Sequence, residues 1–150
     1  MRLAGKIAIV TGAGSGFGEG IAHTFAREGA RVIAGDLNAE AGERVANAIR
    51  VAGGDAHFVH VDVSDGGSVA RLLGATLDRY GDLHIVVNNA GTTHRNKPIL
   101  EITEDEFDRV MAVNVKSIYW TARHMVPHFR ARGGGVFVNV ASTAGIRPRP

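Results

Sequence analysis

Short apolar runs alternate along the chain with longer segments whose apolar residues recur at helical spacing, and this alternation restricts the possible folds. Parallel strands need a crossover connection, usually a helix, so the pattern is typical of a parallel sheet covered by helices on both faces. The run from Ile7 to Val10 is continuous and rich in β-branched residues, as expected for a central strand. We therefore predict an α/β fold with a doubly wound parallel sheet.

The alternation predicts five strands and the helices between them. Strands are expected at residues 7–10, 31–35, 56–61, 83–87 and 136–140. Helices are expected at residues 19–28, at 38–52, from Ser64 or Asp65 past Leu77, and at about 103–130. The last helix starts with a capping box at residues 103–106 and should bend near Pro127.

Composition restricts the class of protein. The 150 residues are enough for one domain, and no linker or repeat marks a second. No apolar run approaches the roughly 18 residues of a membrane helix, and a net charge of +2 with dispersed arginines argues against nucleic-acid binding. The sequence has no cysteine, which excludes thiolate chemistry and agrees with a reducing compartment, so a cytoplasmic protein is expected.

A glycine-rich turn separates the first strand from the first helix. Residues 11–18 are Thr-Gly-Ala-Gly-Ser-Gly-Phe-Gly. The N–H groups and dipole at a helix N-terminus favour an anion, and glycine lets a pyrophosphate approach the backbone. The spacing G-x-G-x-x-G does not fit, because Phe17 and Glu19 stand where its third glycine would fall, but Thr-Gly-x-x-x-Gly-x-Gly fits. The turn indicates a phosphate site, with a purely structural turn as the alternative.

Asp36 ends the second strand, 18 residues beyond Gly18. An acidic residue about 20 residues after such a turn commonly binds the adenosine ribose of a dinucleotide. Its carboxylate can accept hydrogen bonds from ribose hydroxyls but would repel a 2′-phosphate, which favours NAD over NADP. The alternative is a solvated aspartate without a ligand.

Further candidates follow the third, fourth and fifth strands. Asn88-Asn89-Ala90-Gly91 predicts a tight turn with room for a cofactor beside the backbone. Asp62 could serve either a nucleotide or a turn ahead of the next helix. Asn114 lies between two valines and is expected to be a buried amide with partners. Ser142 ends the fifth strand at the carboxyl edge of the sheet, where doubly wound folds bind ligands.

Taken in order, these motifs resemble the classical short-chain dehydrogenase/reductase family from Lys6 to Pro150. Within this family, the sequence is similar in general to sugar dehydrogenases and 3-oxoacyl carrier-protein reductases. The resemblance implies a Rossmann-like sheet of order 3-2-1-4-5 whose last strands would follow Pro150. Residues 1–150 would then be an NAD-binding Rossmann domain that is incomplete at its C-terminus.

The resemblance also implies site residues. Cofactor contacts are expected from Gly12, Ser15, Gly16, Phe17, Gly18, Asp36, Leu37, Asp62, Val63, Asn89, Ala90 and Gly91. Members that use NADP often have a basic residue where this chain has Ser15 and Leu37, so NADP is disfavoured. Asn114 is expected to disturb its helix locally and to help position a catalytic lysine, and Ser142 to bind the substrate oxygen.

The implied function is NAD-dependent interconversion of a secondary alcohol and a ketone, acting on a small alcohol or carbonyl substrate in a homo-oligomer. The family's Tyr-x-x-x-Lys would lie beyond Pro150, since neither Tyr80 nor Tyr119 has a lysine four residues on. The alternatives are a non-catalytic dinucleotide-binding module and an inactive truncated fragment. No metal is expected, because Pro127 separates His124 from His128 and no H-E-x-x-H pattern is present.

Overall fold

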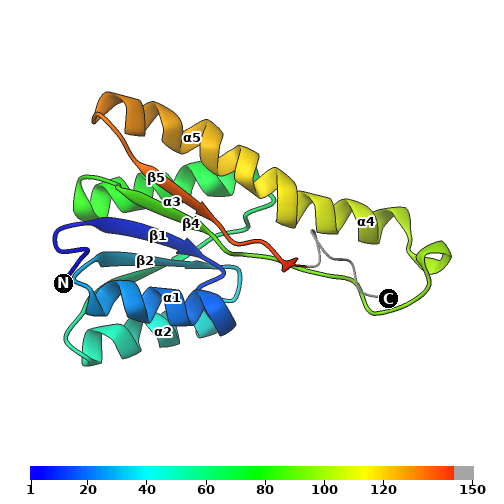
Figure 1. The fold of residues 1–150 in the computed structure, drawn as a ribbon, viewed down its shortest axis with the longest axis horizontal. Helices are drawn as coiled ribbons and strands as arrows, with labels where there is room; N and C mark the ends of the chain where they lie inside the picture. The colour runs from blue at the N-terminus through cyan, green and yellow to red at the C-terminus, as the bar shows by residue number, and fades with distance from the viewer. Residues whose placement is uncertain (144–150) are drawn as a thin grey trace.

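The computed structural model describes residues 1–143, which form a five-stranded parallel sheet with helices on both faces (Figure 1). The strands are β1 (Ile7–Thr11), β2 (Arg31–Asp36), β3 (Asp55–His60), β4 (Ile85–Asn88) and β5 (Val136–Asn139). The helices are α1 (Gly16–Arg27), α2 (Ala39–Val51), α3 (Gly66–Tyr80), α4 (Glu104–Met111) and α5 (Ser117–Ala131), with a 3-10 helix η1 (Ile99–Glu101) and a π-helix η2 (Ala112–Lys116). The observed strand order, β3-β2-β1-β4-β5, confirms the predicted fold.

β1 is the central strand. It pairs in parallel with β2 on one side and β4 on the other, with Ile9 opposite both Ile33 and Val86. Every residue of β1 is buried, because α1 and α2 cover one face of the sheet while α3 and α5 cover the other (Figure 1). Ile9 packs in the core cluster on the α3 and α5 side, and Val10 packs in the opposite cluster. A strand covered on both faces must be apolar throughout, which explains the continuous run in the sequence.

Side-chain caps fix where three of the helices begin. Asn38 Oδ1 accepts a hydrogen bond from the N–H of Ala41 at the start of α2. Of the two predicted starts for α3, the structure selects Asp65, whose carboxylate accepts from the N–H of Ser68. The predicted capping box of Thr103 and Glu106 begins α4. These caps were readable from the sequence because each satisfies helix donors only two or three residues away.

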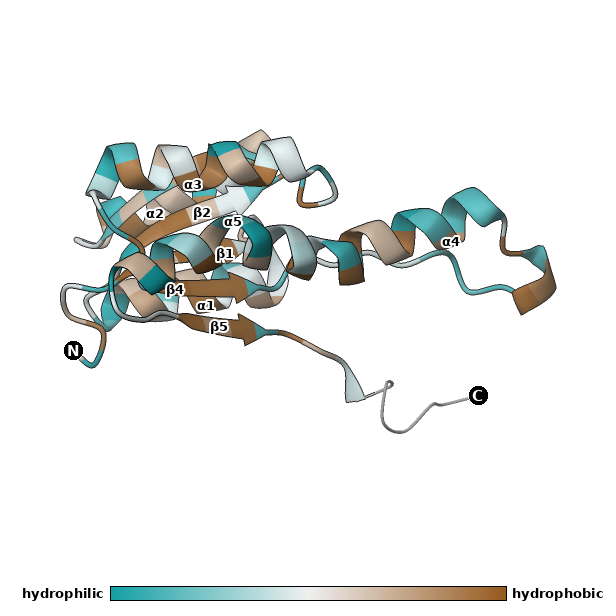
Figure 2. Ribbon diagram, turned by 90° about the horizontal axis from the view of Figure 1, so that it is seen from above, coloured by the Kyte–Doolittle hydropathy of each residue, from teal (hydrophilic) through white to brown (hydrophobic). Residues whose placement is uncertain are grey.

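The long helix expected over residues 103–130 is observed as three consecutive segments, α4, η2 and α5. The π-helix η2 interrupts it, whereas Pro127 lies inside α5 without ending it. Met125 and Phe129 flank Pro127 and are both buried in the core, so tertiary packing holds the helix through the proline. The helix runs through Pro127 to Ala131, about as far as predicted, and the bend expected near Pro127 stays a prediction. Figure 2 shows that α4 projects well beyond the sheet.

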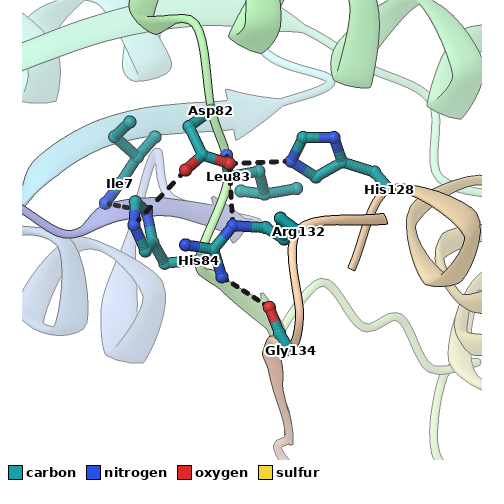
Figure 3. Close-up of polar contacts among 7 residues, drawn as sticks. All are labelled: Ile7, Asp82, Leu83, His84, His128, Arg132 and Gly134. Carbon is teal, nitrogen blue, oxygen red and sulfur yellow. Dashed lines mark hydrogen bonds and ion pairs between the residues drawn. The ribbon is translucent and has the colours of Figure 1, made fainter. Parts of the chain in front are cut away.

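A polar cluster joins the elements at the amino ends of the strands, opposite the edge where β1 leads into α1 (Figure 3). Asp82 Oδ1 accepts hydrogen bonds from His128 Nε2 and Arg132 Nε, both at 2.9 Å. Next to it, His84 Nδ1 accepts from the N–H of Ile7 at 3.1 Å. The cluster therefore connects β1, the segment before β4, and the C-terminal end of α5.

Candidate functional site

A cavity of about 670 Å³ lies at the carboxyl ends of the strands, within the range of about 300–1,000 Å³ usual for ligand sites. Its wall comes from the segments that follow β1, β2, β3 and β4, together with part of α4 and η2. Of the predicted cofactor residues, the wall contains Gly12, Ser15, Phe17, Asp36, Leu37, Asp62, Val63, Asn89, Ala90 and Gly91. Gly16 and Gly18 are not among the residues that line it. This is the edge at which doubly wound sheets bind nucleotides.

Two glycines of the glycine-rich turn are packed tightly against neighbouring backbone. A Cβ on Gly12 would lie 2.8 Å from the Cα of Ala90, and a Cβ on Gly18 would collide with the carbonyl oxygen of Gly12. Gly12 and Gly16 both have positive φ angles, of 64° and 57°. Close approach of a ligand is one reason for glycine at these positions. The structure adds a second reason, which is that Gly12 and Gly18 have no room for a Cβ.

The turn ends at the N-terminus of α1, which differs from the N-termini of α2, α3 and α4. α1 begins at Gly16, three residues earlier than predicted. Its N-cap Ser15 makes no side-chain capping bond, in contrast to the N-caps of α2, α3 and α4. The first-turn N–H groups of an α-helix have no intrahelical acceptor, so an uncapped turn beside a cavity is suited to receive an anion.

Asp36 lies in the cavity wall with both carboxylate oxygens already engaged by backbone. Oδ2 accepts from the N–H of Gly14 at 2.7 Å, and Oδ1 accepts from the N–H of Asn38 at 2.8 Å. An ionised carboxylate has about four acceptor positions, so each oxygen can still accept from a ribose hydroxyl. The backbone bonds hold the carboxylate in place for that contact and orient the glycine-rich turn as well.

The Asn-Asn-Ala-Gly segment is bonded directly to the end of β1. Thr11 Oγ1 accepts from the N–H groups of Asn89 and Ala90, each at 3.1 Å, and donates to the carbonyl of Val87. The Asn89 side chain returns two hydrogen bonds, to the carbonyls of Thr11 and Gly12. The two motifs that the sequence separates by about 75 residues therefore form one rigid wall.

Asp62 makes the turn that was one of its two predicted roles. Its Oδ1 accepts from the N–H of Ser64 at 2.9 Å and from the Ser64 hydroxyl at 2.7 Å. The same residue lines the cavity. The turn role and a ligand role are therefore compatible, and adenine binding by Asp62 stays a prediction.

Asn114 lies in η2, and the predicted burial was wrong because its side chain is exposed. The predicted local disturbance of the helix and the predicted amide partners are both present. Asn114 Oδ1 accepts from the N–H of Thr92 at 2.8 Å, and Nδ2 donates to the carbonyl of Thr92 at 2.9 Å. This pair fastens the projecting helix to the segment after β4, and a Cβ on Gly91 would come within 3.5 Å of the amide oxygen.

Ser142 is exposed, three residues beyond the end of β5, and it is not part of the described cavity wall. Its expected role at a substrate oxygen, like that of Asn114, stays a prediction. Among residues 1–143, no three His, Asp or Glu side chains gather as a metal-binding group. No helix in that part of the chain is long and apolar enough to cross a membrane.

Five residues of the cavity wall were not predicted from the sequence. They are Val61, Ser64, Thr92, Arg109 and Val113. The first three directly adjoin predicted motifs and could have been inferred by extending each motif by one residue. Arg109 and Val113 come from α4 and η2, and their place beside the cavity depends on how that helix crosses the strand ends, for which the local sequence gives no signal.

Residues 6–150 match the short chain dehydrogenase family over nearly the whole chain. The chain belongs to this family. One solved structure with a similar fold is the 3-ketoacyl-(acyl-carrier-protein) reductase of Brucella melitensis complexed with NADH. Its comparison with this chain gives a TM-score of 0.92. The reductase is 44% identical, and the match covers 99% of this chain and 61% of that one.

Other short-chain dehydrogenases are similar in sequence. The 4-formylbenzenesulfonate dehydrogenase of Comamonas testosteroni is 53% identical over 150 residues, which are all of this chain and 60% of that protein. The 2-(R)-hydroxypropyl-CoM dehydrogenase of Xanthobacter autotrophicus is 42% identical over 144 residues, or 94% of this chain and 58% of that protein. The chain thus spans about 60% of the length of these relatives.

Proposed function

We propose that the whole protein is an NAD-dependent oxidoreductase that interconverts a secondary alcohol and a ketone by hydride transfer. When bound, the nicotinamide accepts or donates the hydride, while the residues of this chain hold the dinucleotide. Residues 1–150 would be the NAD-binding part. NADH in the Brucella reductase and the dehydrogenase names of the relatives support this proposal.

The observation that carries the proposal is the pairing of two features in one cavity. The uncapped N-terminus of α1 is suited to a pyrophosphate, and Asp36 at the end of β2 is suited to ribose hydroxyls. An ionised carboxylate beside the ribose would repel the 2′-phosphate of NADP. We therefore propose NAD as the cofactor.

The test is a titration of the wild-type protein and of Asp36→Ala and Asp36→Asn variants with NADH and NADPH, followed by fluorescence. The wild type should bind NADH more tightly than NADPH. Both substitutions should reduce that preference at least about tenfold, since a like-charge contact is removed. The substitutions also remove the hydrogen bonds to Gly14 and Asn38, which would weaken the binding of both nucleotides. The readout is therefore the ratio of the two affinities.

The possible results separate the parts of the proposal. A wild type that binds NADPH as tightly as NADH would contradict the NAD assignment but not dinucleotide binding. A wild type that binds neither nucleotide would contradict the proposed function itself.

We also propose a small-molecule alcohol or carbonyl substrate, a homo-oligomeric assembly, and a cytoplasmic location. The absence of cysteine in the 150 residues supports a reducing compartment. Oligomer formation is supported by a row of exposed apolar residues on α4, η2 and α5, which consists of Phe107, Met111, Val115 and Tyr119.

A further inference from the structure

Arg44 lies on α2, outside the cavity wall, but it holds the glycine-rich turn. Its Nη2 donates to the carbonyl oxygen of Gly14 at 2.9 Å. The N–H of Gly14 donates to Asp36 Oδ2 at 2.7 Å. Residues of neighbouring elements therefore bind both polar backbone groups of Gly14. The next residue, Ser15, is the N-cap of α1.

The same guanidinium forms a two-pronged ion pair with Glu19. Arg44 Nη1 and Nη2 donate to Glu19 Oε1 and Oε2 at 2.8 and 2.9 Å. The hydrogen bond from Arg44 lowers the pKa of the Glu19 carboxyl below its usual value, although partial burial opposes this, so Glu19 is ionised at neutral pH. Glu19 lies in the first turn of α1, where an unpaired carboxylate would repel an arriving pyrophosphate.

We propose that Arg44 is a positioning residue for the dinucleotide pyrophosphate. It fixes the Gly14 peptide, and it neutralises Glu19 so that the positive end of the α1 dipole faces the cavity without an opposing charge. The inference rests on the proposed function. Exposed ion pairs contribute little to stability, so loss of Arg44 should affect nucleotide affinity more than the melting temperature.

Arg50 provides a matched control on the same helix. Its Nη2 donates to Glu43 Oε1 at 2.6 Å, and its Nη1 donates to the carbonyl of Ala56 at 3.1 Å. Arg50 thus also joins a carboxylate and a backbone carbonyl, but neither partner belongs to the cavity wall or the glycine-rich turn in the described part of the chain. Removing it tests the loss of such a contact away from the site.

The experiment measures the Kd for NADH by fluorescence titration of the whole protein and the melting temperature of each variant. Arg44→Met should weaken NADH binding about tenfold, the factor that loss of one charge-assisted hydrogen bond typically gives, whereas Arg50→Met should change it less than about twofold. Arg44→Lys should fall between the wild type and Arg44→Met, because lysine keeps the charge but not the planar fork.

A Glu19→Gln substitution separates the electrostatic role from a merely structural one. Combined with Arg44→Met, it should recover part of the lost NADH affinity although no ion pair remains, since the repelling carboxylate is gone. If Arg44→Met binds NADH as tightly as Arg50→Met, or if Glu19→Gln gives no recovery, the inference is overturned and the proposed function stands. If the wild type binds neither NADH nor NADPH, the inference and the proposed function are both contradicted.

Discussion

At the scale of single residues, two glycines of α1, Gly18 and Gly20, have opposite requirements. Gly18 is buried and faces the Gly12 carbonyl, so nothing larger than hydrogen fits there. Gly20, two residues further along α1, is exposed, and a Cβ added there meets nothing within 4 Å. The two positions look alike in the sequence and differ only in what surrounds them.

These two positions give a paired prediction. Gly18→Ala should lower the free energy of unfolding by about 1–3 kcal/mol and weaken NADH binding, because the turn must shift to relieve the overlap. Gly20→Ala should raise the free energy of unfolding by about 0.5–1 kcal/mol, because alanine restricts the unfolded chain and favours a helix. Urea unfolding and NADH titration of both variants provide the measurement. Equal effects of the two substitutions would contradict this account.

The sequence was informative about residues whose role is local. The Thr103 and Glu106 capping box and the Asn38 cap both depend on neighbours a few residues away. The clamp that Arg44 places on Gly14 joins residues 30 apart and could not be read from any local pattern. The exposure of Asn114 was missed for a similar reason. Its flanking valines suggest a core position, but η2 lies where the helix leaves the body of the molecule.

At the scale of elements, α4, η2 and α5 form the feature that the sequence predicted least well. Four apolar side chains at intervals of four residues along this helix are between 41% and 57% exposed, namely Phe107, Met111, Val115 and Tyr119. Residues four apart are neighbours on a helix surface, so together they make a continuous apolar row. Such rows on an exposed helix commonly mark a protein interface.

The row leads to a prediction about assembly. Light scattering should give the wild-type protein the mass of a dimer or tetramer. Met111→Glu should shift the distribution toward smaller species, because a carboxylate is costly to bury in an apolar interface. Asp78→Lys, a charge change on an exposed position of α3, should leave the mass unchanged. A monomeric wild type would contradict the interface.

At the scale of the whole molecule, the edge of the sheet opposite the cavity is fastened by the Asp82 cluster (Figure 3). Partial burial opposes ionisation of Asp82, but hydrogen bonds from Leu83, Arg132 and His128 outweigh it and lower the pKa of the carboxyl to about 2. His84 must keep Nδ1 unprotonated to accept from the N–H of Ile7. Burial, reinforced by the charge of Arg132, lowers the pKa of His84.

The lowered pKa of His84 predicts how the stability of the protein depends on pH. The unfolded chain binds this proton at a higher pH than the folded chain does. The free energy of unfolding should therefore decrease as the pH falls below the ordinary histidine pKa of about 6.5. Urea unfolding at about pH 7.5 and about pH 5.5 should show a larger decrease in the wild type than in His84→Gln, which cannot take up that proton. An equal decrease in both proteins would contradict the prediction.

The position of β1 between β2 and β4 also sets the order in which the molecule can form during synthesis. β1 can pair with β2 once Arg31 to Gly35 have been synthesised. Its other edge stays unpaired until Ile85 to Val87 of β4 have been synthesised. The bonds from Thr11 to Asn89 and Ala90 span 78 and 79 residues, and contacts of such sequence separation carry a large loop-closure cost. A nascent chain of about 80 residues thus has an open edge on its central strand, and chaperones would be most useful to the protein at that stage.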